Sequence, residues 1–267
     1  MEEEPLLIRI HGDPSGPTMI HLPGIHGDWS MVGDFRREAV KHLCFVEFTY
    51  PRTTTWSMDQ YGQAIYDSLL QHNIKHGWIM AESFGSQLAW KILEIQRKSP
   101  QDFTPEGIIL AGGFVQHMTL CGFKFLGFKI KFSIKTQFTI LRYTGRRILK
   151  RCLRYPLVKE DLMEFKKRRS QLDRDAVKHR LKIIAANDPR PVAAETHIPV
   201  YCMGGLIDLA VIFPHTRYWL WRHCPGYKGG YLMLDPDLRV IGSDHHVLGR
   251  AKKAFAIMSR WMGLNQS

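Results

Sequence analysis

Long apolar runs are missing from this chain, because none approaches the ~18 residues that a membrane-spanning helix needs. The segment from Met1 to Pro5 is acidic, where a secretory signal would be basic and then apolar. C-x-x-C pairs are also missing, and the cysteines are odd in number and widely spaced: Cys44, Cys121, Cys152, Cys202 and Cys224. These absences argue against a disulfide framework and a zinc site. We therefore expect a cytoplasmic protein whose cysteines are buried small hydrophobic residues.

Low-complexity tracts and internal repeats are missing as well, and 45% of the 267 residues are hydrophobic. A chain of this length and composition buries a full core, so we expect one globular α/β domain with an insertion. The net charge of +12 is concentrated in residues 115–195, which hold 20 Lys and Arg against 7 Asp and Glu. The rest of the chain holds 17 against 18. We interpret residues 115–195 as a basic, mainly helical cap, and residues 1–114 and 196–267 as the core.

Short apolar segments bounded by turn residues predict the strands of the core. They are residues 6–10, 18–22, 43–48, 77–80, 107–110, 199–203 and 230–234. Helical patterns occupy residues 32–41, 58–71, 86–97, 215–222 and 248–262. Strands that alternate with helices predict a mainly parallel sheet that is covered by helices on both faces.

The insertion is harder to interpret than the core. Residues 123–135 alternate apolar and basic residues near their end, but their phenylalanines also allow helical spacing, and we expect a helix there. Residues 160–170 and 175–186 predict two basic helices. Asp173 is the expected N-cap of the second helix, and the sequence Asn-Asp-Pro at residues 187–189 is its expected end.

The segment from Ala81 to Gly85 stands between an apolar run and a helical pattern, which predicts a strand, a sharp turn and a helix. Such a turn lifts a serine hydroxyl above the end of a sheet, and small residues flank the serine because the backbone is strained there. The pattern indicates Ser83 as a nucleophile. Ala81 occupies the position of the usual first glycine, and the alternative role for Ser83 is a polar helix cap.

Two backbone N–H groups are candidates for stabilising a developing negative oxygen. Residues 20–29 predict a strand that ends in a glycine-rich turn, and the N–H of Ile25 follows Pro23 and Gly24 in that turn. The N–H of Phe84 lies at the predicted start of a helix, where free N–H groups favour an anion. We expect these two groups to form an oxyanion hole.

An acid and a base follow later in the chain. Asp208 comes after a predicted strand that ends in glycines, and it can orient an imidazole; Asp235 and Asp237 are the alternatives. His245 follows the tight turn that includes Asp244, and it can take the proton from the serine and return it to the leaving group. His246 is the alternative base.

With its serine, acid and histidine in this order, the chain resembles the α/β-hydrolase superfamily over nearly its whole length. The turn L-P-G-I takes the place of the oxyanion loop of that family, the A-E-S-F-G turn is similar to that of several bacterial hydrolases, and the basic stretch sits where the family inserts its variable cap. The resemblance implies the α/β-hydrolase fold and a triad of Ser83, Asp208 and His245. It leaves the substrate open.

Other residues are candidates for the walls of a substrate pocket. His26, Trp29, Phe114 and His117 lie at or beyond the ends of predicted strands, near the expected site. A histidine in such a loop is more often a hydrogen-bonded structural group, and His21 is open to the same interpretation.

The expected activity is hydrolysis of a carboxylic ester or thioester through an acyl-enzyme on Ser83, with no metal or organic cofactor. Carbon–carbon bond hydrolysis, or lyase chemistry on the same triad, is an alternative. A second alternative is a non-catalytic binding module that keeps the scaffold. The charge of the cap is typical of a solvated helix face; the alternatives are an anionic membrane surface, which interleaved lysines and phenylalanines would suit, and an acidic carrier protein. Nucleic acid is disfavoured because no recognition motif accompanies the charge.

Overall fold

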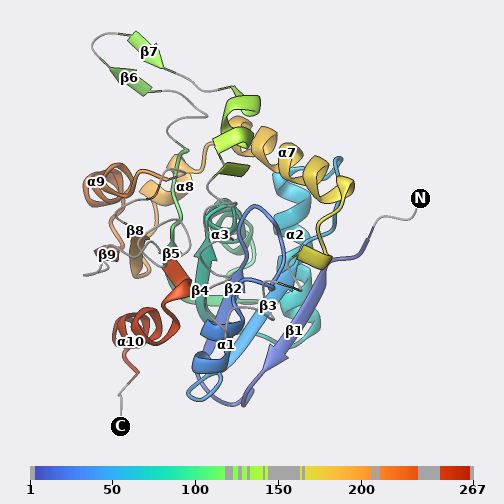
Figure 1. Cartoon of the computed structure of the whole chain (residues 1–267). Coiled ribbons are helices and arrows are strands. Elements are labelled where there is room, and N and C mark those ends of the chain that lie inside the picture. Colours follow the sequence, from blue (N-terminus) through green and yellow to red (C-terminus); the bar gives the residue numbers. More distant parts are fainter. Residues whose placement is uncertain are drawn as a thin grey trace.

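The computed structural model describes residues 4–117, 123–125, 128–130, 133–140, 142–143, 163, 166–205, 208, 211–233 and 247–264. Its main sheet has seven strands in the order β1-β3-β2-β4-β5-β8-β9 (Figure 1). These are β1 (Leu7–His11), β2 (Thr18–Leu22), β3 (Cys44–Thr49), β4 (His76–Glu82), β5 (Thr104–Ala111), β8 (Val200–Gly205) and β9 (Tyr227–Met233). Only β1 is antiparallel to its neighbour, so the predicted mainly parallel sheet is confirmed.

Helices cover both faces of this sheet. Helices α1 (Gly33–Ala39) and α10 (Ala251–Trp261), with the 3₁₀ helix η2 (Val247–Gly249), pack on one face. The other face is covered by α2 (Met58–Gln71), α3 (Gly85–Gln96), α7 (Gln171–Ala186), α8 (Arg190–Ala194) and α9 (Phe213–His223). Because both faces are covered, every residue of the central strand β2 is buried.

The predicted limits of the strands and helices are close to the observed ones, and those of β2 and α2 agree at both ends. Helix α2 is well defined because Ser57 and Gln60 form a capping box at its start. Buried, unbonded cysteines are confirmed at Cys44, Cys202 and Cys224, and burial raises the pKa of the Cys202 thiol to about 12. Within the described parts of the chain, no helix is long and apolar enough to cross a bilayer.

Two predictions for the insertion are wrong. Residues 123–135 do not form one helix: β6 (Phe123–Phe125) and β7 (Phe128–Ile130) form an antiparallel hairpin, and helix appears from residue 134. The period-two alternation was therefore the correct signal in that segment. Ser170, and not Asp173, is the N-cap of α7, and Asp173 completes a capping box three residues later. The predicted end of that helix is confirmed by Asn187, its C-cap.

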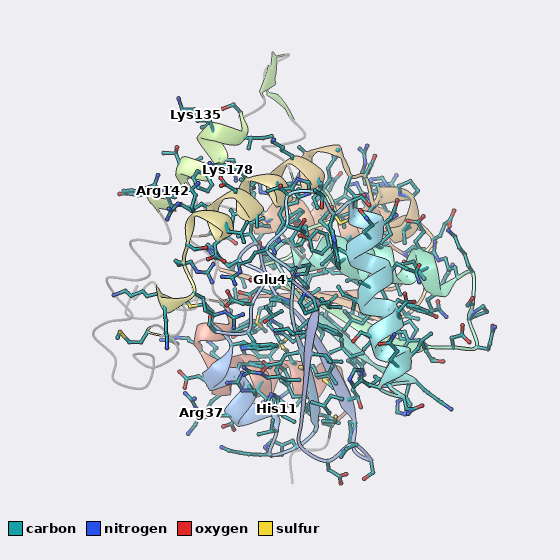
Figure 2. All side chains as sticks on the ribbon, turned by 90° about the vertical axis from the view of Figure 1, so that its right-hand side faces the viewer. Glu4, His11, Arg37, Lys135, Arg142 and Lys178 are labelled. Carbon is teal, nitrogen blue, oxygen red and sulfur yellow. The ribbon has the colours of Figure 1, made fainter. Side chains whose placement is uncertain are left out.

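The remaining predictions for the insertion concern its limits and its charge. Most of residues 160–170 lies outside the described residues, and the division at residues 115 and 195 stays a prediction. Residues 134–140 lie beside α7 at the end of the molecule away from α1 and α10 (Figure 1). Figure 2 shows Lys135, Arg142 and Lys178 gathered at that end, far from Arg37 and His11.

A buried carboxylate ties α1 to the first strands. The Glu47 side chain on β3 is completely buried, and Arg36 of α1 donates to both of its oxygens at 2.8 and 2.9 Å. His11 Nε2 on β1 lies 3.1 Å from the same carboxylate. A buried charge of this kind is tolerated only while its partners stay in place.

We predict that Arg36→Met lowers the free energy of unfolding by about 3 kcal/mol, because it leaves the Glu47 carboxylate buried without its two-pronged partner. Arg37→Met is the matched control at the next position, where the pair with Asp34 is exposed, and it is expected to change stability by less than about 0.5 kcal/mol. Urea unfolding measures both. Equal effects of the two substitutions would contradict a structural role for the Arg36 and Glu47 pair.

Candidate active site

Ser83 occupies the sharp turn between β4 and α3, as the sequence predicts. Its φ is +47°, a left-handed conformation that a residue with a side chain adopts only when the surroundings enforce it. The Ser83 N–H donates to the Ala111 carbonyl at 3.3 Å, and the Ser86 N–H and Oγ donate to the Ser83 carbonyl at 3.0 and 2.6 Å. These hydrogen bonds hold the strained serine at the end of β4.

Glycine at position 85 is required by a close approach of backbone. A Cβ atom on Gly85 would lie 2.2 Å from the carbonyl oxygen of Leu22, which ends β2. Helix α3 therefore starts directly against the end of the neighbouring strand. Ala81 in place of the usual glycine is accommodated, because its side chain is fully buried in the core.

The predicted oxyanion turn lies beside the serine. A Cβ on Gly24 would be 3.4 Å from the Ser83 Cβ, so the turn and the nucleophile candidate are in contact. Carbonyl groups fix this turn: Gly24 accepts from the Gly27 N–H at 2.9 Å, and Pro23 accepts from the Tyr50 hydroxyl at 3.2 Å.

The two predicted oxyanion donors belong to the turn that holds Ser83 and to the Gly24 turn that contacts it. Neither the Ile25 N–H nor the Phe84 N–H donates to another of the described residues. Phe84 is fully buried and immediately precedes α3, and its ring packs edge-on against Tyr50 and Tyr61. Both amides therefore lie beside Ser83, and the segments that carry them are fixed by the hydrogen bonds and ring contacts described above.

Arg180 of α7 is a residue of this region that we did not predict. It is 1% exposed, and its two Nη atoms donate at 2.9 Å to the carbonyls of Ile25 and Pro51. Its guanidinium also lies 5.6 Å from the ring centroid of Tyr50, a favourable cation–π distance. The sequence held one signal for it, because Arg180 falls in helical register with the apolar Val177 and is therefore on the buried face of α7.

Beside the oxyanion turn, Arg169 joins two side chains. Its Nη1 lies 2.9 Å from His26 Nδ1, and its Nη2 pairs with the Asp28 carboxylate. Burial among the surrounding loops and the charge of Arg169 lower the pKa of His26, although part of its side chain is exposed to solvent. Burial opposes ionisation of Asp28, but the charge of Arg169 and the hydrogen bonds from Ser30 together outweigh it, and the pKa of Asp28 is lowered. At neutral pH His26 is thus an uncharged acceptor.

Asp208 lies beyond the end of β8, at the same edge of the sheet as Ser83. Its Oδ1 accepts from the Val211 N–H at 2.9 Å, and the residue is partly buried. His245, His246 and Asp244 lie outside the described residues, as do the alternative acids Asp235 and Asp237. The structure resumes at Val247, which is buried in the same apolar cluster as Met203 of β8. The triad geometry stays a prediction.

The predicted pocket walls separate into two groups. Phe114 and His117 are buried next to the sharp turn between β4 and α3. The Phe114 N–H donates to Ser86 Oγ at 3.1 Å, and the His117 ring packs edge-on against Phe114. Trp29 lies in the apolar cluster beneath α1 and α10, with Arg9 stacked 3.7 Å from its ring centroid, so it is a core residue.

His21 is fully buried, and its Nε2 is 3.5 Å from Glu82 Oε2, but neither of its ring nitrogens has a hydrogen-bond partner among the described residues. Within the described parts of the chain, no group of three or more His, Cys, Asp and Glu side chains is arranged to hold a metal ion.

No family model and no curated protein matches this sequence. Solved structures do match its fold. The enol-lactonase from Burkholderia xenovorans has a TM-score of 0.71 at 16% identity, over 97% of this chain and 96% of the other. The esterase from Exiguobacterium antarcticum has a TM-score of 0.69 at 13% identity, over 96% of this chain and 95% of the other. An α/β-hydrolase enzyme from a deep-sea metagenome library has a TM-score of 0.67 at 13% identity, over 100% of this chain and 97% of the other. The chain therefore has the α/β-hydrolase fold.

We predict that Gly85→Ala lowers the free energy of unfolding by about 1–3 kcal/mol, because a methyl group cannot be placed 2.2 Å from a carbonyl oxygen without moving α3. Gly16→Ala is the control, since its Cβ would meet no heavy atom nearer than 3.4 Å and it is expected to be neutral. Thermal unfolding of the two variants checks this. A Gly85→Ala protein as stable as the Gly16→Ala protein would rule out the close approach.

Proposed function

We propose that the protein is a serine hydrolase that cleaves a carboxylic ester or thioester through an acyl-enzyme on Ser83. The observation that supports this best is the left-handed backbone of Ser83, held between β4 and α3 with the Gly24 turn against it. A strained serine at that position contributes nothing to folding stability. The strained turn does have a use if Ser83 is a nucleophile, because it raises the hydroxyl above the edge of the sheet. The fold supports the same proposal, because an esterase and an enol-lactonase share it.

The proposed mechanism assigns one task to each group. Ser83 attacks the carbonyl carbon, while His245 takes its proton and then gives that proton to the leaving group. Asp208 fixes the imidazole tautomer and stabilises its charged form. The Ile25 and Phe84 N–H groups donate to the oxyanion, and they lie beside Ser83 without acceptors among the described residues. His245 then takes a proton from water, the water oxygen attacks the acyl carbon, and His245 gives the proton to Ser83 Oγ as the acid is released.

We predict that a fluorophosphonate probe labels Ser83, and that Ser83→Ala abolishes both labelling and the turnover of p-nitrophenyl esters. His245→Ala is expected to slow labelling by about 10²- to 10⁴-fold, because the general base is lost. His246→Ala is the matched control at the neighbouring position and is expected to keep most of the rate. Peptide mass spectrometry identifies the labelled residue.

Two results would count against this assignment. A folded protein that reacts with neither probe nor esters would favour the non-catalytic binding module. Loss of rate in His246→Ala, with His245→Ala unaffected, would move the base to the neighbouring histidine.

Asp208→Asn is expected to lower kcat with little change in melting temperature, which separates the acid from a residue that only forms a turn.

Arg180 is expected to position the oxyanion turn. Arg180→Met frees the Ile25 carbonyl, which loosens the turn that carries the Ile25 N–H, and kcat is predicted to fall by about 10- to 10³-fold, with a smaller change in KM. Arg174→Met, on the exposed side of the same helix, is the control and is expected to leave kcat unchanged. Steady-state kinetics on folded variants measure the difference. An unchanged kcat in Arg180→Met would limit Arg180 to stability.

A further inference from the structure

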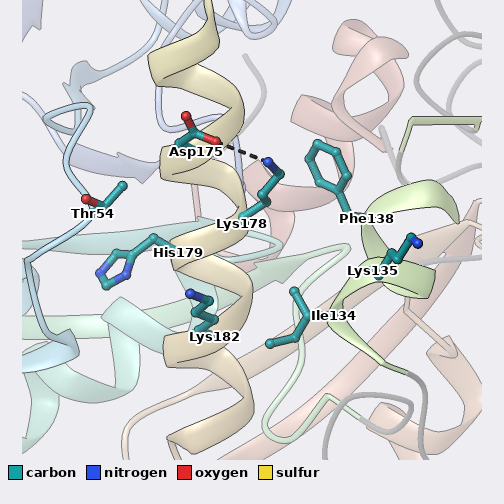
Figure 3. Close-up of a pocket in the computed structure, with 8 residues that line it drawn as sticks. All are labelled: Thr54, Ile134, Lys135, Phe138, Asp175, Lys178, His179 and Lys182. Carbon is teal, nitrogen blue, oxygen red and sulfur yellow. Dashed lines mark hydrogen bonds and ion pairs between the residues drawn. The ribbon is translucent and has the colours of Figure 1, made fainter.

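A cavity of about 340 Å³ is lined by residues of α7 and of the segment 134–140, together with Thr54 (Figure 3). Its volume is within the range of pockets that bind small molecules, about 300–1,000 Å³. The cavity belongs mainly to the basic segment, and neither Ser83 nor Asp208 is among the described residues that line it.

Three lysines line this cavity: Lys135, Lys178 and Lys182. Lys178 is neutralised, because its Nζ lies 3.1 Å from the carboxylate of Asp175, the acidic residue of the lining. Hydrogen bonds from Gln171, and then from Lys178, lower the pKa of Asp175, so it stays ionised and its charge is used within α7. Lys135 and Lys182 form no ion pair with any described residue. The charges of Lys135 and Lys182 are therefore not offset by any carboxylate among the described residues.

Apolar surface stands next to these charges. Ile134 and Phe138 are one helical turn apart, line the cavity and pack their inner sides on the main core. The Lys178 ammonium lies 5.5 Å from the centroid of the Phe138 ring. A ligand that enters the cavity thus meets the apolar side chains of Ile134 and Phe138 together with lysine side chains from residues 134–140 and from α7 (Figure 3).

We propose that this cavity binds an amphipathic organic anion, in which a carboxylate or phosphate group pairs with Lys135 and Lys182 and an apolar chain or ring lies on Ile134 and Phe138. Lysine suits either anion, because its ammonium is a mobile point charge on a flexible stem. The inference goes beyond the proposed function, since binding here needs no reaction at Ser83.

The cavity is built from elements that also contact the candidate active site. His179 lines it and its Nε2 lies 2.7 Å from the Trp56 carbonyl, while the next residue, Arg180, holds the oxyanion turn from the opposite side of α7. Gln137, between the two apolar lining residues, has its amide 3.4 Å from His117. A bound anion would therefore join α7 and residues 134–140 to each other directly above these contacts.

Calorimetric titration of the full chain, with Ser83→Ala as background to prevent turnover, tests the proposal. The probes are decanoate, decyl phosphate, inorganic phosphate and decanol, each below its micelle concentration. Decanoate or decyl phosphate is expected to bind, and the double variant Lys135→Gln/Lys182→Gln is expected to weaken that binding about five- to tenfold. Decanol affinity is expected to change less than twofold. Preference between the two anions identifies the carboxylate or the phosphate as the natural group.

Matched variants separate this site from the candidate active site, where decanoate is a product analogue. Arg174→Gln removes one charge from α7 outside the cavity and is expected to leave all affinities unchanged. Lys135→Arg/Lys182→Arg keeps the charge and is expected to restore binding. Circular dichroism checks that each variant is folded. Equal affinities of the parent and the double glutamine variant would overturn the proposal, and so would inorganic phosphate binding as tightly as decyl phosphate.

Discussion

The contact between Gly85 and the Leu22 carbonyl is the constraint on which the candidate site depends. Helix α3 begins so close to the end of β2 that residue 85 has no room for a side chain. With the helix start and β4 both fixed, only Ser83 and Phe84 are left to reverse the chain, and Ser83 takes a left-handed conformation to do so. The same close approach brings the end of β2, and with it Gly24, against the serine. One backbone contact therefore places both the nucleophile candidate and the oxyanion turn.

The buried charge of Arg180 makes the basic insertion part of this arrangement. Removing a guanidinium from water costs several kcal/mol, and no carboxylate among the described residues offsets that cost here. Two carbonyls, of Ile25 and Pro51, and two aromatic faces take its place, while Nε–H has no acceptor among the described residues. Arg180 can stay buried in this way only while α7 remains in contact with the oxyanion turn. The inner face of α7 is thus a structural element of the candidate site, and the charge on it is not a solvated surface.

Local sequence patterns predicted most of the core because interactions between near neighbours in the chain set where its helices and turns begin. The capping box of Ser57 sets the start of α2, and the strand-turn-helix pattern around Ser83 needs only near neighbours in the chain. The hairpin at residues 123–130 was missed because its alternation and its helical spacing both fit the sequence, and pairing between strands decided between them. Arg180 was missed for a different reason. Its partners are 155 and 129 residues away in the chain, and no spacing rule connects them.

Composition treats the 20 basic residues of the insertion as one feature, but the structure divides them by their partners. Arg169 and Arg180 point inward, where Asp28 and backbone carbonyls of the core accept their hydrogen bonds. Lys135 and Lys182 face a cavity and have no carboxylate partner among the described residues. The first pair would hold the insertion on the core even if nothing else bound. Both side chains of the second pair are exposed to solvent, next to the apolar surface of Ile134 and Phe138. An amphipathic anion would contact the charges and the apolar surface together, and for that reason we favour a ligand at this cavity over a solvated helix face.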